Sequence, residues 1–143
     1  MCRSRPSAPT ASKPPAPNRG ADAERCAAHY LQQHGLVLLA QNVLYRQGEL
    51  DLVMEHGDNL VFVEVRLRRG SRFGGAIGSV TVTKQRRIIG AARQYLAAHP
   101  TLAERPCRFD LVALDEDHRG HRRIQWLQAA FDTCIPDPKR EWT

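Results

Sequence analysis

The sequence lacks the long hydrophobic runs and paired cysteines that mark membrane proteins and zinc-binding domains. No apolar stretch among its 143 residues is long enough to span a bilayer. Its four cysteines form no CxxC pair and no zinc-ligand spacing, which is typical of reduced thiols in a cytoplasmic protein. The GK[ST] of a phosphate-binding P-loop and the GxGxxG of a dinucleotide fold are also missing. The length suits one domain with one core.

Residues 1–19 lack acidic side chains and the apolar core of a signal peptide. They are rich in Pro, Ser, Ala and Arg, so we expect a disordered basic tail rather than an exported leader. The chain carries a net charge of +6, and four of these charges lie in the tail. The excess that remains is mild. It is compatible with a polyanionic partner but does not require one.

Hydrophobic periodicity and turn residues divide the remainder of the chain into helices and strands. Helices are predicted over residues 20–34 and 83–99, and strands over 36–45, 49–55, 60–68, 109–114 and 123–128. The first three strands form an antiparallel meander, and the strand after the second helix returns to the sheet by a crossover. We therefore expect an α/β domain at 20–130, with a mixed sheet flanked by helices, and a loose tail at 131–143.

The centre of this pattern is a hairpin built from GELDL (48–52) and FVEVR (62–66), which flank a turn around Gly57. If the hairpin folds symmetrically about 57 and 58, Asp51 lies opposite Glu64 and Glu49 lies opposite Arg66. Side chains alternate along a strand, so these four share one face. The other face is predicted to be apolar and to carry Leu50, Leu52, Val63 and Val65.

Two carboxylates at this spacing, Asp51 and Glu64, repel each other by roughly 3 kcal/mol at about 5 Å and an effective dielectric near 20. A stable hairpin needs a group that compensates for the repulsion. A bound cation, a shared proton and a basic neighbour such as Arg66 are all candidates. Hard cations such as Mg²⁺ prefer oxygen ligands, so a metal site and a simple surface ion pair are both open from the pattern alone.

A third acid, Glu24, lies at the edge of the apolar stripe of the first helix. One interpretation is a first-turn acid that the helix dipole favours. The other is a third carboxylate that points toward the hairpin.

Basic side chains follow the hairpin along the chain. They could meet a phosphate backbone or simply form a solvated surface. Gln85 stands on the apolar stripe of the second helix, where an amide needs a partner. The candidate nucleic-acid contacts are Arg68, Arg69, Arg72, Lys84 and Arg87.

Together these motifs resemble those of the YraN-like family of bacterial proteins. The resemblance rests on Glu24, GELDL (48–52), FVEVR (62–66), Phe73-Gly74 and Lys84-Gln85, and it covers roughly residues 20–130. The family is described as predicted endonucleases distantly related to archaeal Holliday junction resolvases. The resemblance therefore implies a restriction-endonuclease-like, three-layer fold with a PD-(D/E)xK type site.

The resemblance also implies roles for individual residues. Asp51 and Glu64 become the metal-binding acids, and Glu24 adds a helix acid as a further ligand. Arg66 falls where the family pattern has lysine, and Gln85 matches a lysine–glutamine pair of less defined role. A later Arg-x-Asp strand element, Arg108 and Asp110, matches a feature that is structural in character.

The implied activity is hydrolysis of phosphodiester bonds with Mg²⁺ or Mn²⁺. The implied partner is nucleic acid, DNA in the first place and branched DNA by analogy with resolvases, which also act as homodimers. Arg66 cannot act as a general base, because guanidinium stays protonated, but it can bind a phosphate. A non-catalytic nucleic-acid-binding module with the same fold is the alternative, and a protein-interaction domain ranks third.

Overall fold

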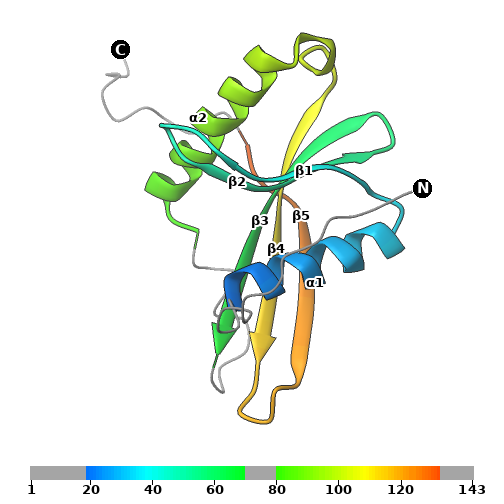
Figure 1. Cartoon of the computed structure of the whole chain (residues 1–143), viewed down its shortest axis with the longest axis vertical. Coiled ribbons are helices and arrows are strands. Elements are labelled where there is room, and N and C mark those ends of the chain that lie inside the picture. The colour runs from blue at the N-terminus through cyan, green and yellow to red at the C-terminus, as the bar shows by residue number, and fades with distance from the viewer. Residues whose placement is uncertain (1–18, 70–79, 133–143) are drawn as a thin grey trace, which may run out of the picture.

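The computed structural model describes residues 19–69 and 80–132, which form a five-stranded mixed sheet with a helix packed on each face (Figure 1). The strands follow the order β1-β2-β3-β4-β5, and β3 and β4 form the one parallel pair of this sheet. The predicted fold class is confirmed: the architecture is α/β and consistent with a restriction-endonuclease-like fold. Neither α-helix in the described ranges is long and apolar enough to cross a membrane. The elements are α1 (Arg19–Gln33), β1 (Val37–Leu44), β2 (Glu49–His56), β3 (Asn59–Arg69), α2 (Val82–Ala98), η2 (Pro100–Leu102), β4 (Cys107–Glu116) and β5 (Arg122–Phe131).

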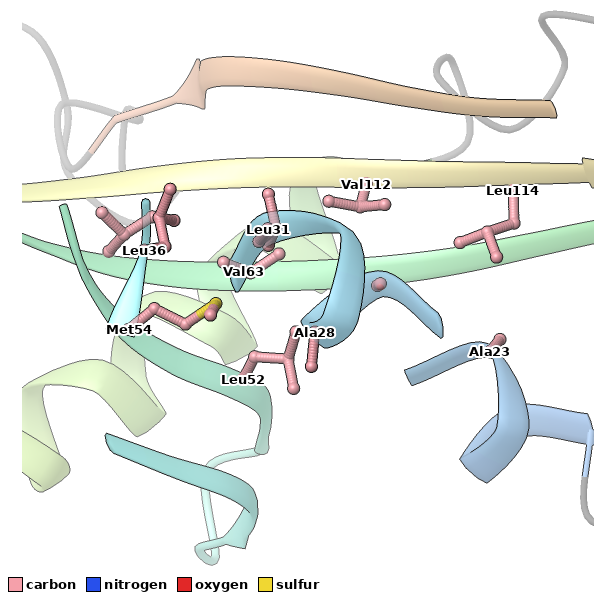
Figure 2. Close-up of a cluster of buried hydrophobic side chains, with 11 residues drawn as sticks. Ala23, Ala28, Leu31, Leu36, Leu52, Met54, Val63, Val112 and Leu114 are labelled. Atoms are coloured by element: carbon pink, nitrogen blue, oxygen red, sulfur yellow. The ribbon is translucent and has the colours of Figure 1, made fainter. Parts of the chain in front are cut away.

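The helix α1 covers one face of the sheet with a stripe of small and branched side chains. Ala23, Ala27, Ala28 and Leu31 are buried at helical spacing, and the chain turns at Gly35, where φ is +93°. The stripe packs on a cluster that includes Leu52, Met54, Val63, Val112 and Leu114 (Figure 2). Because these side chains come from β2, β3 and β4, the cluster fixes α1 across the middle of the sheet.

The helix α2 covers the other face and lies against the β1–β2 hairpin. Thr81 caps its first turn by accepting a hydrogen bond from the Lys84 N–H at 3.1 Å. The turn of the hairpin touches the helix so closely that a Cβ on Gly48 would lie 2.7 Å from the Arg87 carbonyl oxygen. Gly48 thus allows backbone-to-backbone contact, and this contact sets the position of α2 relative to β2.

The hairpin register is the one predicted, but its two faces are not. Leu52 pairs with Val63 and Val53 with Phe62, as symmetry about 57 and 58 requires. Leu50, however, packs in the α2 cluster with Val53, whereas Leu52 belongs to the α1 cluster. The prediction that Leu50 shares a face with Leu52 is therefore wrong.

The predicted pairing of Glu49 with Arg66 is also wrong. The β2–β3 ladder ends at residue 52, and Glu49 pairs with Leu44 of β1 instead. The start of β2 follows β1 rather than β3, which turns its side chains away from the simple alternation.

The Arg-x-Asp element of β4 forms a buried polar network. Asp110 is fully buried and binds the Arg108 guanidinium through both carboxylate oxygens, at 2.8 and 2.9 Å. It also accepts hydrogen bonds from the Trp126 indole and the Ala129 backbone N–H, where β5 bulges. The element is thus a structural tie between β4 and β5. β5 runs to Phe131, one residue into the segment expected to be a loose tail.

Candidate active site

The two acids predicted to face each other lie where the β2–β3 ladder ends. Beyond the last pair, Leu52 with Val63, the carboxylate of Asp51 accepts the Val65 backbone N–H at 2.9 Å. This bond directs Asp51 toward β3, where its carboxyl group also hydrogen-bonds that of Glu64. The predicted juxtaposition of Asp51 and Glu64 is therefore present in the structure.

The environment of Glu64 favours its protonated form. Its side chain is only 4% exposed, and burial is the largest cause that raises its pKa, to about 8. The negative charge of Asp51 raises it further, while Lys84 and Arg66 oppose the shift. Near neutral pH Glu64 therefore keeps its proton, and a divalent ion could replace that proton.

Two basic side chains from different elements flank the pair. The Arg66 Nη1 of β3 and the Lys84 Nζ of α2 each lie 3.8 Å from Glu64 Oε2. The position of Arg66 agrees with its predicted place in the site. Lys84 was predicted as a contact for nucleic acid, and its place beside the acid pair was missed, because it lies 20 positions after Glu64, on a helix and not on the strand that carries the acid.

Glu24 approaches the same acids from α1. Burial is the largest cause that raises the pKa of Glu24, and the charges of Asp51 and Glu49 raise it further. Asn42 of β1 forms a side-chain hydrogen bond with Glu24 and lowers its pKa. Asn42 has a φ of +53°, a left-handed backbone conformation within a strand. Sequence reasoning missed this residue, although an asparagine in an otherwise apolar run could have indicated it.

The role of a first-turn acid in α1 belongs to another residue. Asp22 is the acid of the first turn, and its carboxylate binds Arg122 of β5 at 2.7 Å. Glu24 lies further along the helix, so the interpretation of Glu24 as a dipole-stabilising acid loses its basis.

The remaining predicted residues are more dispersed. The Gln85 amide donates a hydrogen bond to the Val80 carbonyl oxygen at 3.1 Å, which provides the partner that a half-buried amide requires. Arg69 is ion-paired with Glu116 at 3.5 Å. Arg68 and Arg87 are exposed at the end of β3 and in α2, and position 72 lies outside the described residues.

The acids fit a metal ion that takes two protein carboxylates. Within residues 19–69 and 80–132, no three His, Cys, Asp or Glu side chains are gathered closely enough to hold a metal ion. Mg²⁺ commonly binds through one or two carboxylates and completes its shell with water and substrate phosphate. Asp51 and Glu64 suit that mode, because their carboxyl groups lie together and an ion could take the place of the proton on Glu64. Glu24 as a further ligand stays a prediction.

The sequence that contains this site is similar to those of other bacterial proteins. Residues 23–114 match the sequence profile of "Uncharacterised protein family UPF0102", a range that includes both acids and both flanking cations. A UPF0102 protein of Pseudomonas fluorescens is 50% identical over 114 residues, 80% of this chain and 93% of its own length. One from Nitrosomonas europaea is 50% identical over 115 residues, covering 80% and 94%. One from Xanthomonas campestris is 51% identical over 118 residues, covering 81% and 94%.

Proposed function

The chain belongs to the family UPF0102, and from its acid pair we propose that it is a metal-dependent endonuclease that hydrolyses phosphodiester bonds in nucleic acid. The observation that carries the proposal is the buried contact between Asp51 and Glu64, with the pKa of Glu64 raised to about 8. Perturbed acids with a specific charged partner are typical of functional sites. Simple scaffolding does not need two acids in this arrangement.

The residues around the pair suit a phosphodiester substrate. Asp51 and Glu64 would hold a Mg²⁺ or Mn²⁺ ion, which would supply Lewis-acid chemistry for the attack of water on a phosphodiester. Arg66 is held on the same edge and can bind a phosphate oxygen without acting as a base. The Arg66 side chain is 34% exposed, so a ligand that approaches the pair can reach it.

The exposed basic residues Arg68 and Arg87 extend the proposed contact surface toward the phosphate backbone. DNA is the proposed substrate and branched DNA the proposed preferred form, as the resemblance to resolvases implies. Two copies of the chain would cut two strands symmetrically.

The test is a cleavage assay on branched, flapped, linear and single-stranded DNA with Mg²⁺ or Mn²⁺. The matched control is the double variant Asp51→Asn and Glu64→Gln, which keeps the size of both side chains but removes their charge. We expect cleavage by the wild type that this control and chelation both abolish. Equal cleavage by the two proteins, or no cleavage of any of these substrates, would rule the proposal out.

The second candidate is a nucleic-acid-binding module without catalysis, and Arg66 favours it, since the related site type carries lysine there. This candidate predicts salt-sensitive DNA binding that does not depend on metal. Arg66→Lys separates the two candidates further. The endonuclease proposal expects this variant to cleave at least as fast as the wild type, whereas a binding module stays inactive with either residue.

A further inference from the structure

One carboxylate oxygen of the proposed metal-binding pair already has two cations beside it. Glu64 Oε2 lies 3.8 Å from Lys84 Nζ and 3.8 Å from Arg66 Nη1. Glu64 is 4% exposed, whereas the Lys84 side chain is 38% exposed and can turn toward solvent. An ion at this oxygen and the Lys84 ammonium would therefore be close together and repel each other.

The position of Lys84 in its helix is unfavourable unless the acids hold it there. It is the third residue of α2, whose first turn contains no acid, and the helix dipole disfavours a positive charge at that end. The Thr81 cap and the contact of Gly48 with Arg87 fix the backbone of this turn beside the hairpin. Lys84 is thus delivered to Glu64 by the packing of α2 and not by the strand that carries the acids.

We propose that Lys84 is a built-in counter-ion of the acid pair, which a divalent metal ion displaces and which then binds the phosphate backbone of the nucleic acid. The proposal rests on the endonuclease function proposed above. In the metal-free protein Lys84 lies beside Glu64 and offsets the negative charge of the acid pair. With the metal bound, Lys84 is released from Glu64 and the site gains positive charge, which attracts a phosphate.

This arrangement couples the binding of metal and nucleic acid. While Lys84 lies beside Glu64, it lowers the affinity of the acid pair for the metal ion. A phosphate that binds Lys84 draws it away from Glu64 and removes the competition between Lys84 and the metal ion. By linkage, the metal must raise the affinity for nucleic acid by the same factor. Arg66 lies on the same strand as Glu64 and stays beside it with or without the metal ion. Lys84 lies on another element and is the more exposed of the two cations, so it is the group that is displaced.

The experiment measures Mn²⁺ affinity by electron paramagnetic resonance, with and without a short DNA duplex whose phosphorothioate linkages resist hydrolysis. The proteins are the wild type, Lys84→Met, Lys84→Arg and Arg93→Met. Arg93→Met is the matched control, because it removes a positive charge from an exposed position of the same helix. Circular dichroism and thermal unfolding verify that each variant is folded.

Without DNA, Lys84→Met is expected to bind Mn²⁺ about three- to tenfold more tightly than the wild type. Arg93→Met should match the wild type. DNA should strengthen Mn²⁺ binding by the wild type and by Lys84→Arg, but much less by Lys84→Met.

The outcomes separate this inference from the function on which it rests. If the wild type binds Mn²⁺ and Lys84→Met binds it with the same or lower affinity, the counter-ion role of Lys84 is overturned and the endonuclease proposal stands. Equal DNA enhancement in the wild type and Lys84→Met also overturns the coupling. If no variant binds Mn²⁺, both proposals fail.

Discussion

Replacing Glu64 with glutamine should make the metal-free protein more stable, and the gain should grow with pH. Burial and the charge of Asp51 raise the pKa of Glu64 from 4.5 to about 8 in the folded chain. Between these values the unfolded chain loses the proton while the folded chain keeps it, so stability falls as pH rises. Below about pH 4.5 both states are protonated, and above about pH 8 the penalty is constant. Glutamine carries no charge and escapes the penalty.

The size of the effect follows from the shift. Each pH unit corresponds to about 1.4 kcal/mol, so the full window gives an upper limit of about 5 kcal/mol. Rearrangement of Lys84 and Arg66 around an ionised Glu64 offsets part of this amount. We expect Glu64→Gln to raise the free energy of unfolding by about 1–3 kcal/mol near pH 8 and by less than about 1 kcal/mol near pH 5.

Urea denaturation of both proteins across this pH range, with a chelator present, measures the difference. The control is Glu104→Gln, an exposed glutamate in the segment before β4. Two results would contradict this prediction: a Glu64→Gln variant less stable than the wild type near pH 8, or a gain in stability that does not change with pH. Either result would mean that Glu64 is not held as a buried acid against Asp51.

Three further predictions concern the metal, the hairpin and the β4 network. Because Glu64 is largely protonated below about pH 8, Mn²⁺ binding near pH 7 should release close to one proton, and calorimetry in buffers of different ionisation enthalpy detects it. Gly48→Ala should destabilise the fold by about 1–3 kcal/mol in urea denaturation, since its Cβ would lie 2.7 Å from the Arg87 carbonyl oxygen. Asp110→Asn should cost about 3–5 kcal/mol in thermal or urea unfolding, because it leaves the Arg108 guanidinium without its buried partner. An unchanged free energy of unfolding in either variant would contradict the packing described.

The features that the sequence predicted correctly are those that depend on neighbouring residues. The turn around Gly57 and the alternation of flanking residues were enough to set the register of β2 with β3, and with it the contact between Asp51 and Glu64. The helix of residues 82–98 was recognisable from its apolar stripe and from the proline that follows it. These features are local, so the periodicity of a few residues determines them.

What the sequence did not predict depends on contacts between distant elements. Lys84 joins the acids only because α2 packs on the β1–β2 hairpin, and nothing near Lys84 in the sequence records that contact. Leu50 changes face because the start of β2 follows β1, and strand alternation cannot show such a turn. Asn42 acquires its role from the left-handed backbone of β1 beside α1, which the chain pattern alone does not reveal.

The proposed function requires that Asp51 and Glu64 together bind a divalent ion. The most direct measurement is the anomalous difference density of crystals grown with Mn²⁺ and collected near the manganese absorption edge. We expect a peak in contact with both carboxylates that is absent from the Asp51→Asn and Glu64→Gln double variant. Crystals whose manganese lies elsewhere, or whose two carboxylates still hydrogen-bond each other at saturating Mn²⁺, would contradict it.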